Sequence, residues 1–205
     1  MNNAIYPLFP SPLVVCGKKY EFTIAEKQYI SELEMIDNIG NLMSKNDKVL
    51  DSKELADLKH FIDEQIFNFK KNLLKIKDQN EIYITQSCVN SSGPNQYHAR
   101  HKHPNSVISG VMFLDEDNDE SLPPIRFHRT LDMFPLQFSF DELNEFNASA
   151  REFDPEQGML MLFPSLVEHD VDRNTSGRMR TSISFNTYVR GIVGGRKQLT
   201  EINIS

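Results

Sequence analysis

Residues 96–111 read QYHARHKHPNSVISGV and hold three of the six histidines of this 205-residue chain, His98, His101 and His103. On a β-strand, side chains two positions apart point to the same face, so His101 and His103 can converge on one point. His98 has the opposite parity and is expected to face away. Two converging imidazoles indicate a metal site, with a solvent-exposed polar strand end as the alternative.

A further histidine follows a second apolar segment. The stretch GMLMLFPSLVEHDVDRN (158–174) places His169 beyond a Pro-Ser turn, in a short segment of its own. A third metal ligand can arrive there from a strand that is distant in sequence. Taken alone, His169 would be interpreted as an ordinary turn histidine. It becomes a candidate metal ligand only in combination with the pair His101 and His103.

The next strand candidate, RMRTSISFN (178–186), carries a polar face. Arg180, Ser182, Ser184 and Asn186 share one side of this strand, because they lie two residues apart. One cation and three hydrogen-bonding groups on a face can hold a small carboxylate, which a guanidinium binds through two parallel hydrogen bonds. An amphipathic strand with its polar face in water is the alternative.

Short β-rich segments alternate with turn residues after Lys77. They cover residues 81–88, 96–103, 107–114, 124–129, 158–163, 167–171 and 180–189. Strands at roughly 8–12-residue spacing are typical of an antiparallel sandwich, barrel or jelly roll. Residues 130–157 are less periodic and are expected to form a long irregular connection.

The first eighty residues are predicted to be mostly helical. Apolar residues at three- and four-residue spacing indicate one helix within 24–43 and a second from Leu55 to Ile76. The sequence therefore predicts a single domain over 1–205. Residues 1–80 form its helical N-terminal extension and residues 81–205 its mainly β core.

Composition and charge narrow the classes of function. The chain is 39% hydrophobic and 25% charged, which is typical of a globular domain. It has 29 acidic and 22 basic residues and a net charge of −7, whereas proteins that bind nucleic-acid backbones usually show a basic excess. No apolar run approaches the roughly 20 residues that cross a bilayer. With two cysteines and a proline-interrupted N-terminus, the expected location is cytoplasmic.

In combination, these motifs resemble those of the iron(II)- and 2-oxoglutarate-dependent oxygenases, and within them a subgroup from phages and bacteria. The matching segments, in order, are LFPSPL (8–13), HKHPNSVISGV (101–111), LFPSLVEH (162–169) and RTSISFN (180–186). The resemblance implies a double-stranded β-helix, or jelly roll, with N-terminal helices packed against it. It also implies Fe(II), 2-oxoglutarate and O2, and a hydroxylase that releases succinate and CO2.

The resemblance also implies roles for individual residues. His101 and His169 correspond to the two histidine ligands of iron, and His103 stands where the wider superfamily has Asp or Glu. Arg180 corresponds to the residue that binds the distal carboxylate of 2-oxoglutarate, with Ser182 assisting it. Further candidates for contacts to this cosubstrate, with packing as the alternative, are Tyr97 and Ser109.

Several alternatives stay open at this point. Asp170 or Glu168 could supply a carboxylate ligand in place of His103, and His128 could face the pocket or solvent. The substrate would be a protein side chain, as in prolyl hydroxylases, or a small molecule. A nucleobase target is disfavoured by the acidic charge. A non-catalytic jelly-roll or metal-binding module is the non-enzymatic alternative.

The sequence says less about what surrounds the site. The acidic loop 115–120 and the segment 131–154 are candidates for flanking its mouth, because binding loops are carried on rigid scaffolds. Solvated surface is the alternative for both. No membrane partner is expected, and a homodimer is possible.

Overall fold

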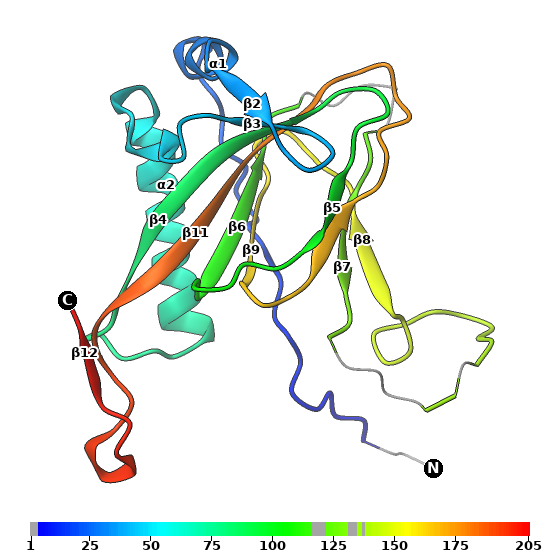
Figure 1. The fold of residues 1–205 in the computed structure, drawn as a ribbon. Coiled ribbons are helices and arrows are strands. Elements are labelled where there is room, and N and C mark those ends of the chain that lie inside the picture. Colours follow the sequence, from blue (N-terminus) through cyan, green and yellow to red (C-terminus); the bar gives the residue numbers. More distant parts are fainter. Residues whose placement is uncertain (1–3, 116–121, 131–134, 137) are drawn as a thin grey trace.

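Two antiparallel sheets organise the chain (Figure 1). The computed structural model describes residues 4–115, 122–130, 135–136 and 138–205. In the larger, eight-stranded sheet the order is β1-β9-β6-β11-β4-β3-β2, with β12 pairing with β11, and the smaller sheet has the order β5-β10-β7-β8. The acidic loop 115–120 lies outside the described residues except for Asp115, and so does part of the segment 131–154.

The strands of the larger sheet are β1 (Val14–Val15), β2 (Met35–Asp37), β3 (Leu42–Ser44), β4 (Glu81–Ser92), β6 (Ile108–Phe113), β9 (Leu160–Pro164), β11 (Arg180–Val193) and β12 (Ile202–Ile204). Those of the smaller sheet are β5 (His98–His101), β7 (Ile125–His128), β8 (Ala150–Phe153) and β10 (His169–Val171). The long strands β4 and β11 pair from Glu81 with Arg190 to Ser92 with Arg180. This mainly β architecture confirms the predicted fold class.

The larger sheet buries both of its faces. On one face, Met112 of β6 and Ile183 and Phe185 of β11 belong to a core shared with the helices. On the other face, Val111 and Phe113 of β6 pack with residues of β7 and β10 in a second core between the sheets. Since side chains alternate along a strand, the polar residues of β11 that begin at Arg180 face the smaller sheet.

Two helices cover the outer face of the larger sheet. Helix α1 (Ile24–Ser31) begins with a capping box, in which the Glu26 backbone N–H donates to Thr23 Oγ1 and the Thr23 N–H donates to the Glu26 carboxylate. Helix α2 (Ala56–Asn68) continues as a wider turn through Phe69–Leu73 and buries an apolar stripe against the sheet, as predicted for this segment. None of the described helices is long and apolar enough to cross a membrane.

The helix expected over 24–43 is wrong in its second half. Helix α1 ends at Ser31, and the chain then forms the hairpin of β2 and β3. Gly40 has a φ of +88°, which favours glycine, and the Asn38 N–H donates to the Asn41 carbonyl at 2.9 Å. This turn forms a hairpin here, although the three-residue spacing of apolar residues had indicated a helix. Strand β8 likewise lies within the segment expected to be irregular.

The packing around Gly110, in the middle of β6, explains why the SGV segment has a glycine at this position. It pairs with Phe185 of β11, and a Cβ on Gly110 would lie 2.2 Å from Cζ of that ring. The ring is 2% exposed and has no room to retreat. Gly110→Ala is therefore expected to lower the free energy of unfolding by about 1–3 kcal/mol, as overpacking a core does. Urea unfolding checks this, and an unchanged midpoint would contradict the packing described.

Candidate metal centre

Three histidines meet at one point, two from strands of the smaller sheet and one from the turn that follows β5. His101 ends β5 and His169 begins β10, and the two residues are directly paired across these strands. His103 follows in the turn after β5, and its backbone N–H donates to the Ser165 carbonyl at 2.8 Å. One potential ligand atom from each of the three side chains lies within 4.8 Å of the others. The predicted convergence of His101, His103 and His169 is thus seen in the structure.

Backbone carbonyls orient two of these rings. Nδ1 of His101 lies 2.7 Å from the Ala99 carbonyl, and Nδ1 of His169 lies 3.0 Å from the Val167 carbonyl. A carbonyl only accepts, so each Nδ1 donates and each Nε2 keeps a free lone pair. The Nε2 atoms of His103 and His169 lie 3.4 Å apart.

Burial favours the neutral imidazole of His103 and of His169. Burial, followed by the charge of the neighbouring His101, lowers the pKa of His169 to about 3 and that of His103 to about 4. Neutral imidazole is the form that binds a metal ion. The cluster therefore presents nitrogen donors ready for a divalent cation of the kind that imidazole suits, such as iron, zinc, copper or nickel.

His98 was predicted to face away, and this is wrong. Its ring stacks on that of His101, with centroids 4.5 Å apart. Between the paired positions His169–His101 and Val171–His98, β10 advances by two residues and β5 by three. This bulge inverts the alternation of side chains. Burial, followed by the charges of His101 and Arg180, lowers the pKa of His98 to about 3, so this ring is neutral as well.

Arg180, at the start of β11, is 4% exposed and lines the same cavity as the histidines. Its Nε donates to the Pro123 carbonyl at 3.0 Å, and its guanidinium carbon lies 5.3 Å from the Phe113 ring centroid. Its Nη2 is buried and has no hydrogen-bond partner among the residues that the structure describes. Burial lowers the pKa of Arg180 to about 10, so the group is still charged at neutral pH. A buried cation with an unused donor is a receptor for a carboxylate.

The carboxylates next to His169 are engaged elsewhere. Glu168 accepts from Arg100 Nε at 2.8 Å. Asp170 accepts from Arg126 Nε at 3.0 Å through one oxygen, and its other oxygen lies 2.7 Å from Nε2 of His128. Among the described residues, no carboxylate joins the histidine cluster. His128 therefore belongs to a hydrogen-bond network beside the site, and His103 is the third member of the histidine cluster.

A cavity of about 370 Å³ between the sheets contains the histidines and Arg180. Ser182 and Ser184 of β11 line it, as their shared parity predicted. Ser109 does not line it: its hydroxyl lies 2.9 Å from Ser165 Oγ and 2.8 Å from Asn186 Oδ1. The sequence did not point to another part of the lining, formed by Asn38, Ile39, Met43, Cys88 and Asn90.

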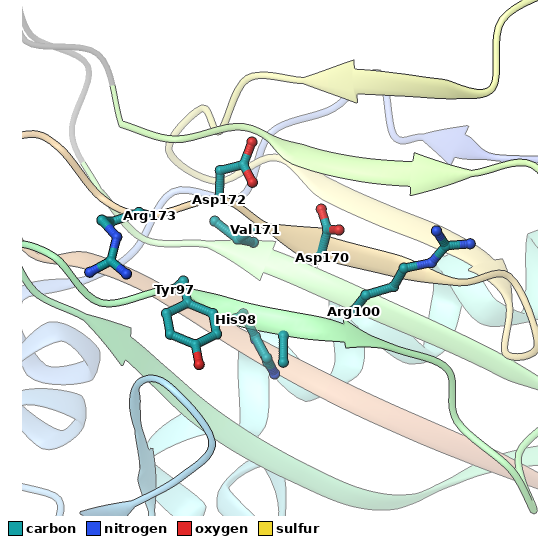
Figure 2. A pocket seen from close by; sticks show the side chains of 8 residues that line it. Tyr97, His98, Arg100, Asp170, Val171, Asp172 and Arg173 are labelled. Atoms are coloured by element: carbon teal, nitrogen blue, oxygen red, sulfur yellow. The ribbon is translucent and has the colours of Figure 1, made fainter.

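A second, open hollow of about 400 Å³ adjoins the cavity at the boundary of β5 and β10, and Figure 2 shows its lining. The two share residues from His98 to Arg100 and the pair Asp170–Val171. Tyr97 lies here, with the Arg173 guanidinium carbon 5.9 Å from its ring centroid, rather than in the cavity. The structure therefore does not bring Tyr97 to the histidine cluster.

Comparison with known proteins agrees with this architecture. Residues 86–186 match a family described as "Putative 2OG-Fe(II) oxygenase". The span includes His101, His103, His169 and Arg180. No curated protein matches the sequence.

Solved structures share the fold at low sequence identity. An oxidoreductase of the 2OG-Fe(II) oxygenase family from Burkholderia pseudomallei is 13% identical, with a TM-score of 0.59 over 86% of this chain and 84% of that one. A prolyl-4-hydroxylase from Pseudomonas putida is 17% identical, with a TM-score of 0.55 over 80% and 81%. HygX from Streptomyces hygroscopicus, solved with nickel, 2-oxoglutarate and hygromycin B, is 10% identical, with a TM-score of 0.61 over 87% and 83%.

The architecture is thus that of the jelly-roll oxygenases, with a histidine cluster and a buried arginine inside the roll. The family match across the strands that carry this cluster makes the assignment specific. The family match over residues 86–186 and the shared fold together indicate a 2-oxoglutarate-dependent oxygenase.

Proposed function

We propose that this protein is an Fe(II)- and 2-oxoglutarate-dependent dioxygenase that hydroxylates a protein side chain or a small molecule. The observation that carries the proposal is the buried Nη2 of Arg180, which no described residue pairs, in the cavity that His101, His103 and His169 also line. A metal-binding cluster alone does not require a carboxylate receptor beside it. The two together fit a small dicarboxylate that reaches both.

The residues present fit both groups. His101, His103 and His169 would hold the iron through imidazole nitrogens, and Arg180 would bind the distal carboxylate, with the Ser182 hydroxyl beside it on the same strand face. Bound iron would supply the oxidative chemistry that converts 2-oxoglutarate and O2 into succinate and CO2 and adds one oxygen atom to the substrate. The protein would bind and orient the reactants.

His103 distinguishes this site from one with two histidines and a carboxylate. Three neutral imidazoles bring no negative charge to the metal, so a chelating 2-oxoglutarate would bring the compensating charge itself. We therefore expect metal and cosubstrate to bind cooperatively. The nickel affinity of the protein, measured with and without N-oxalylglycine, checks this: equal affinities would contradict it.

Two of the solved structures bear on the substrate. HygX was solved with the small molecule hygromycin B, and a prolyl hydroxylase from Trichoplax adhaerens was solved with a peptide fragment. Both kinds of target thus occur on this fold, and a nucleobase target is disfavoured by the acidic charge of this chain. Two predictions from the sequence stay predictions. One is that residues 1–205 form a single domain, and the other is that the protein comes from a bacterium or phage and acts in the cytoplasm.

Succinate formation tests the proposal. The purified protein with Fe(II), ascorbate, 2-oxoglutarate and O2 is expected to release succinate slowly even without substrate, and the rate should be lost when the metal is chelated. Arg190→Ala, on the exposed part of β11, serves as a control that should keep the rate. No succinate above the chelated sample would favour the non-catalytic alternative, a jelly-roll module with a metal site.

A further inference from the structure

Part of the cavity lining comes from the larger sheet and has no assigned role. It consists of Asn38, Ile39 and Met43 from the β2–β3 hairpin and Cys88 and Asn90 from β4. We name these residues the hairpin wall. They lie at the β4-β3-β2 end of the larger sheet, whereas His98, His101 and His169 belong to strands of the smaller sheet. The hairpin wall therefore lines the same cavity from the sheet that faces the metal cluster.

The hairpin is fixed in place relative to the histidines. The Tyr97 N–H donates to the Gly40 carbonyl at 2.9 Å, which ties the hairpin tip to the residue just before β5. A Cβ on Gly40 would lie 2.8 Å from the Tyr97 carbonyl oxygen and 2.9 Å from its ring. Met43 is in turn paired with Asn90 of β4. The tip thus connects the two sheets next to His98, on the same cavity as the histidine cluster.

The described lining offers no free charge to a substrate. Its charged members are Arg100, Asp170 and Arg180. Arg100 is paired with Glu168, and both oxygens of Asp170 have partners. Arg180 is taken by the cosubstrate under the proposed function. An ionic group in this cavity would be desolvated without a counter-ion, which costs free energy.

The hairpin wall itself is neutral and partly apolar. Ile39 is 72% exposed and Met43 half-buried, so apolar surface is available to a bound molecule. The Asn90 amide nitrogen donates to Ser184 Oγ at 2.8 Å, and the Asn38 amide nitrogen donates to Asn41 Oδ1 at 3.0 Å. Each amide nitrogen therefore uses one of its two N–H groups within the protein. What remains for a substrate is aliphatic surface, a thiol and uncharged amide groups.

We propose that the hairpin wall binds the group to be oxidised and that this group is an uncharged aliphatic chain. The inference rests on the proposed function, since the wall selects what is placed before the iron. It names Ile39, Met43 and Cys88 as the residues that determine specificity. Substrates with a charge next to the oxidised carbon would be rejected.

Cys88 provides a direct readout of occupancy. The chain has two cysteines, and Cys16 is 9% exposed within the core beside the helices. Cys88 is half-buried and lines the cavity, and burial raises the pKa of its thiol, so alkylation is slow enough to follow. The rate at which N-ethylmaleimide modifies Cys88, measured by peptide mass spectrometry, reports whether a probe covers the wall.

The test compares matched probes at equal millimolar concentration: the N-acetyl methylamides of leucine, glutamate and lysine. The protein is used with nickel and N-oxalylglycine bound, and also without them. The leucine compound is expected to slow Cys88 alkylation about fivefold and the charged compounds less than twofold. Equal or better protection by a charged compound, or no protection by the leucine compound, would overturn the inference.

A variant pair sharpens the test. Ile39→Asp places a carboxylate on the wall and is expected to favour the lysine compound over the leucine compound by about two- to fivefold, the range of an exposed ion pair. Ile36→Asp is the matched control, because Ile36 is on the same hairpin, 41% exposed and outside the cavity lining. An unchanged order of probes in Ile39→Asp would also overturn the inference. Failure of nickel or N-oxalylglycine to bind would instead count against the proposed function. In that case, protection of Cys88 by the three compounds in the metal-free protein would still test which of them the hairpin wall binds.

Discussion

His169→Ala is expected to reduce metal affinity at least about 100-fold and to abolish succinate formation. Changes in groups that merely orient metal ligands cost about 10- to 100-fold, so loss of a ligand should cost at least as much. His169 is 6% exposed and presents Nε2 to the cluster, while its Nδ1 is held by the Val167 carbonyl. Isothermal titration of the metal-free protein with nickel measures the affinity directly.

The matched control is His60→Ala. His60 lies on α2 with its side chain 78% exposed, and its Nε2 is 3.5 Å from Glu64. Removing it should leave nickel affinity and stoichiometry unchanged. This would show that losing one histidine anywhere in the chain is not enough to weaken nickel binding. Full nickel stoichiometry in His169→Ala, at wild-type affinity, would reject the ligand assignment. The same titration of His101→Ala should give the same loss.

Arg180→Ala is expected to weaken 2-oxoglutarate binding about 10- to 100-fold while nickel affinity changes little. A hydrogen bond to a charged group contributes about 1.5–3 kcal/mol, and Arg180 has an unused buried donor for one. Arg180→Lys should recover only part of the affinity, because an ammonium lacks the planar fork that holds a carboxylate. Competition with N-oxalylglycine on the nickel-loaded protein provides the measurement.

Arg190→Ala is the control for this change. Arg190 lies on the same strand, outside the cavity, where its guanidinium carbon is 3.9 Å from the Tyr83 ring centroid. The Arg190→Ala variant should bind 2-oxoglutarate as the unmodified protein does. If Arg180→Ala binds 2-oxoglutarate normally, the carboxylate receptor is elsewhere.

The sequence predicted the parts of the site that depend on regular alternation. Arg180, Ser182 and Ser184 share a face because β11 is regular there. In a regular strand, the spacing of two residues alone determines that these side chains point to the same side. His101 and His103 converge as their spacing implied. The strands of the β core were also found near their predicted positions, because each is a short β-rich segment bounded by turn residues.

The departures came from backbone irregularities that the residue pattern does not show. One bulge in β5 turned His98 toward His101, and one glycine turn at Gly40 converted an expected helix into a hairpin. The hairpin then brought Ile39 and Met43 into the cavity, which no local pattern indicated. Tyr97 and Ser109 were expected at the cosubstrate, but tertiary contacts draw them to Arg173 and Asn186.

The central claim is that His101, His103 and His169 hold iron(II) while Arg180 holds 2-oxoglutarate in the same cavity. Anaerobic titration of the metal-free protein with iron(II) and 2-oxoglutarate tests it most directly, because a chelated complex gives a weak visible charge-transfer band. We expect a band that requires both components and saturates at one iron per chain. Iron binding without any band at saturating 2-oxoglutarate would contradict the claim.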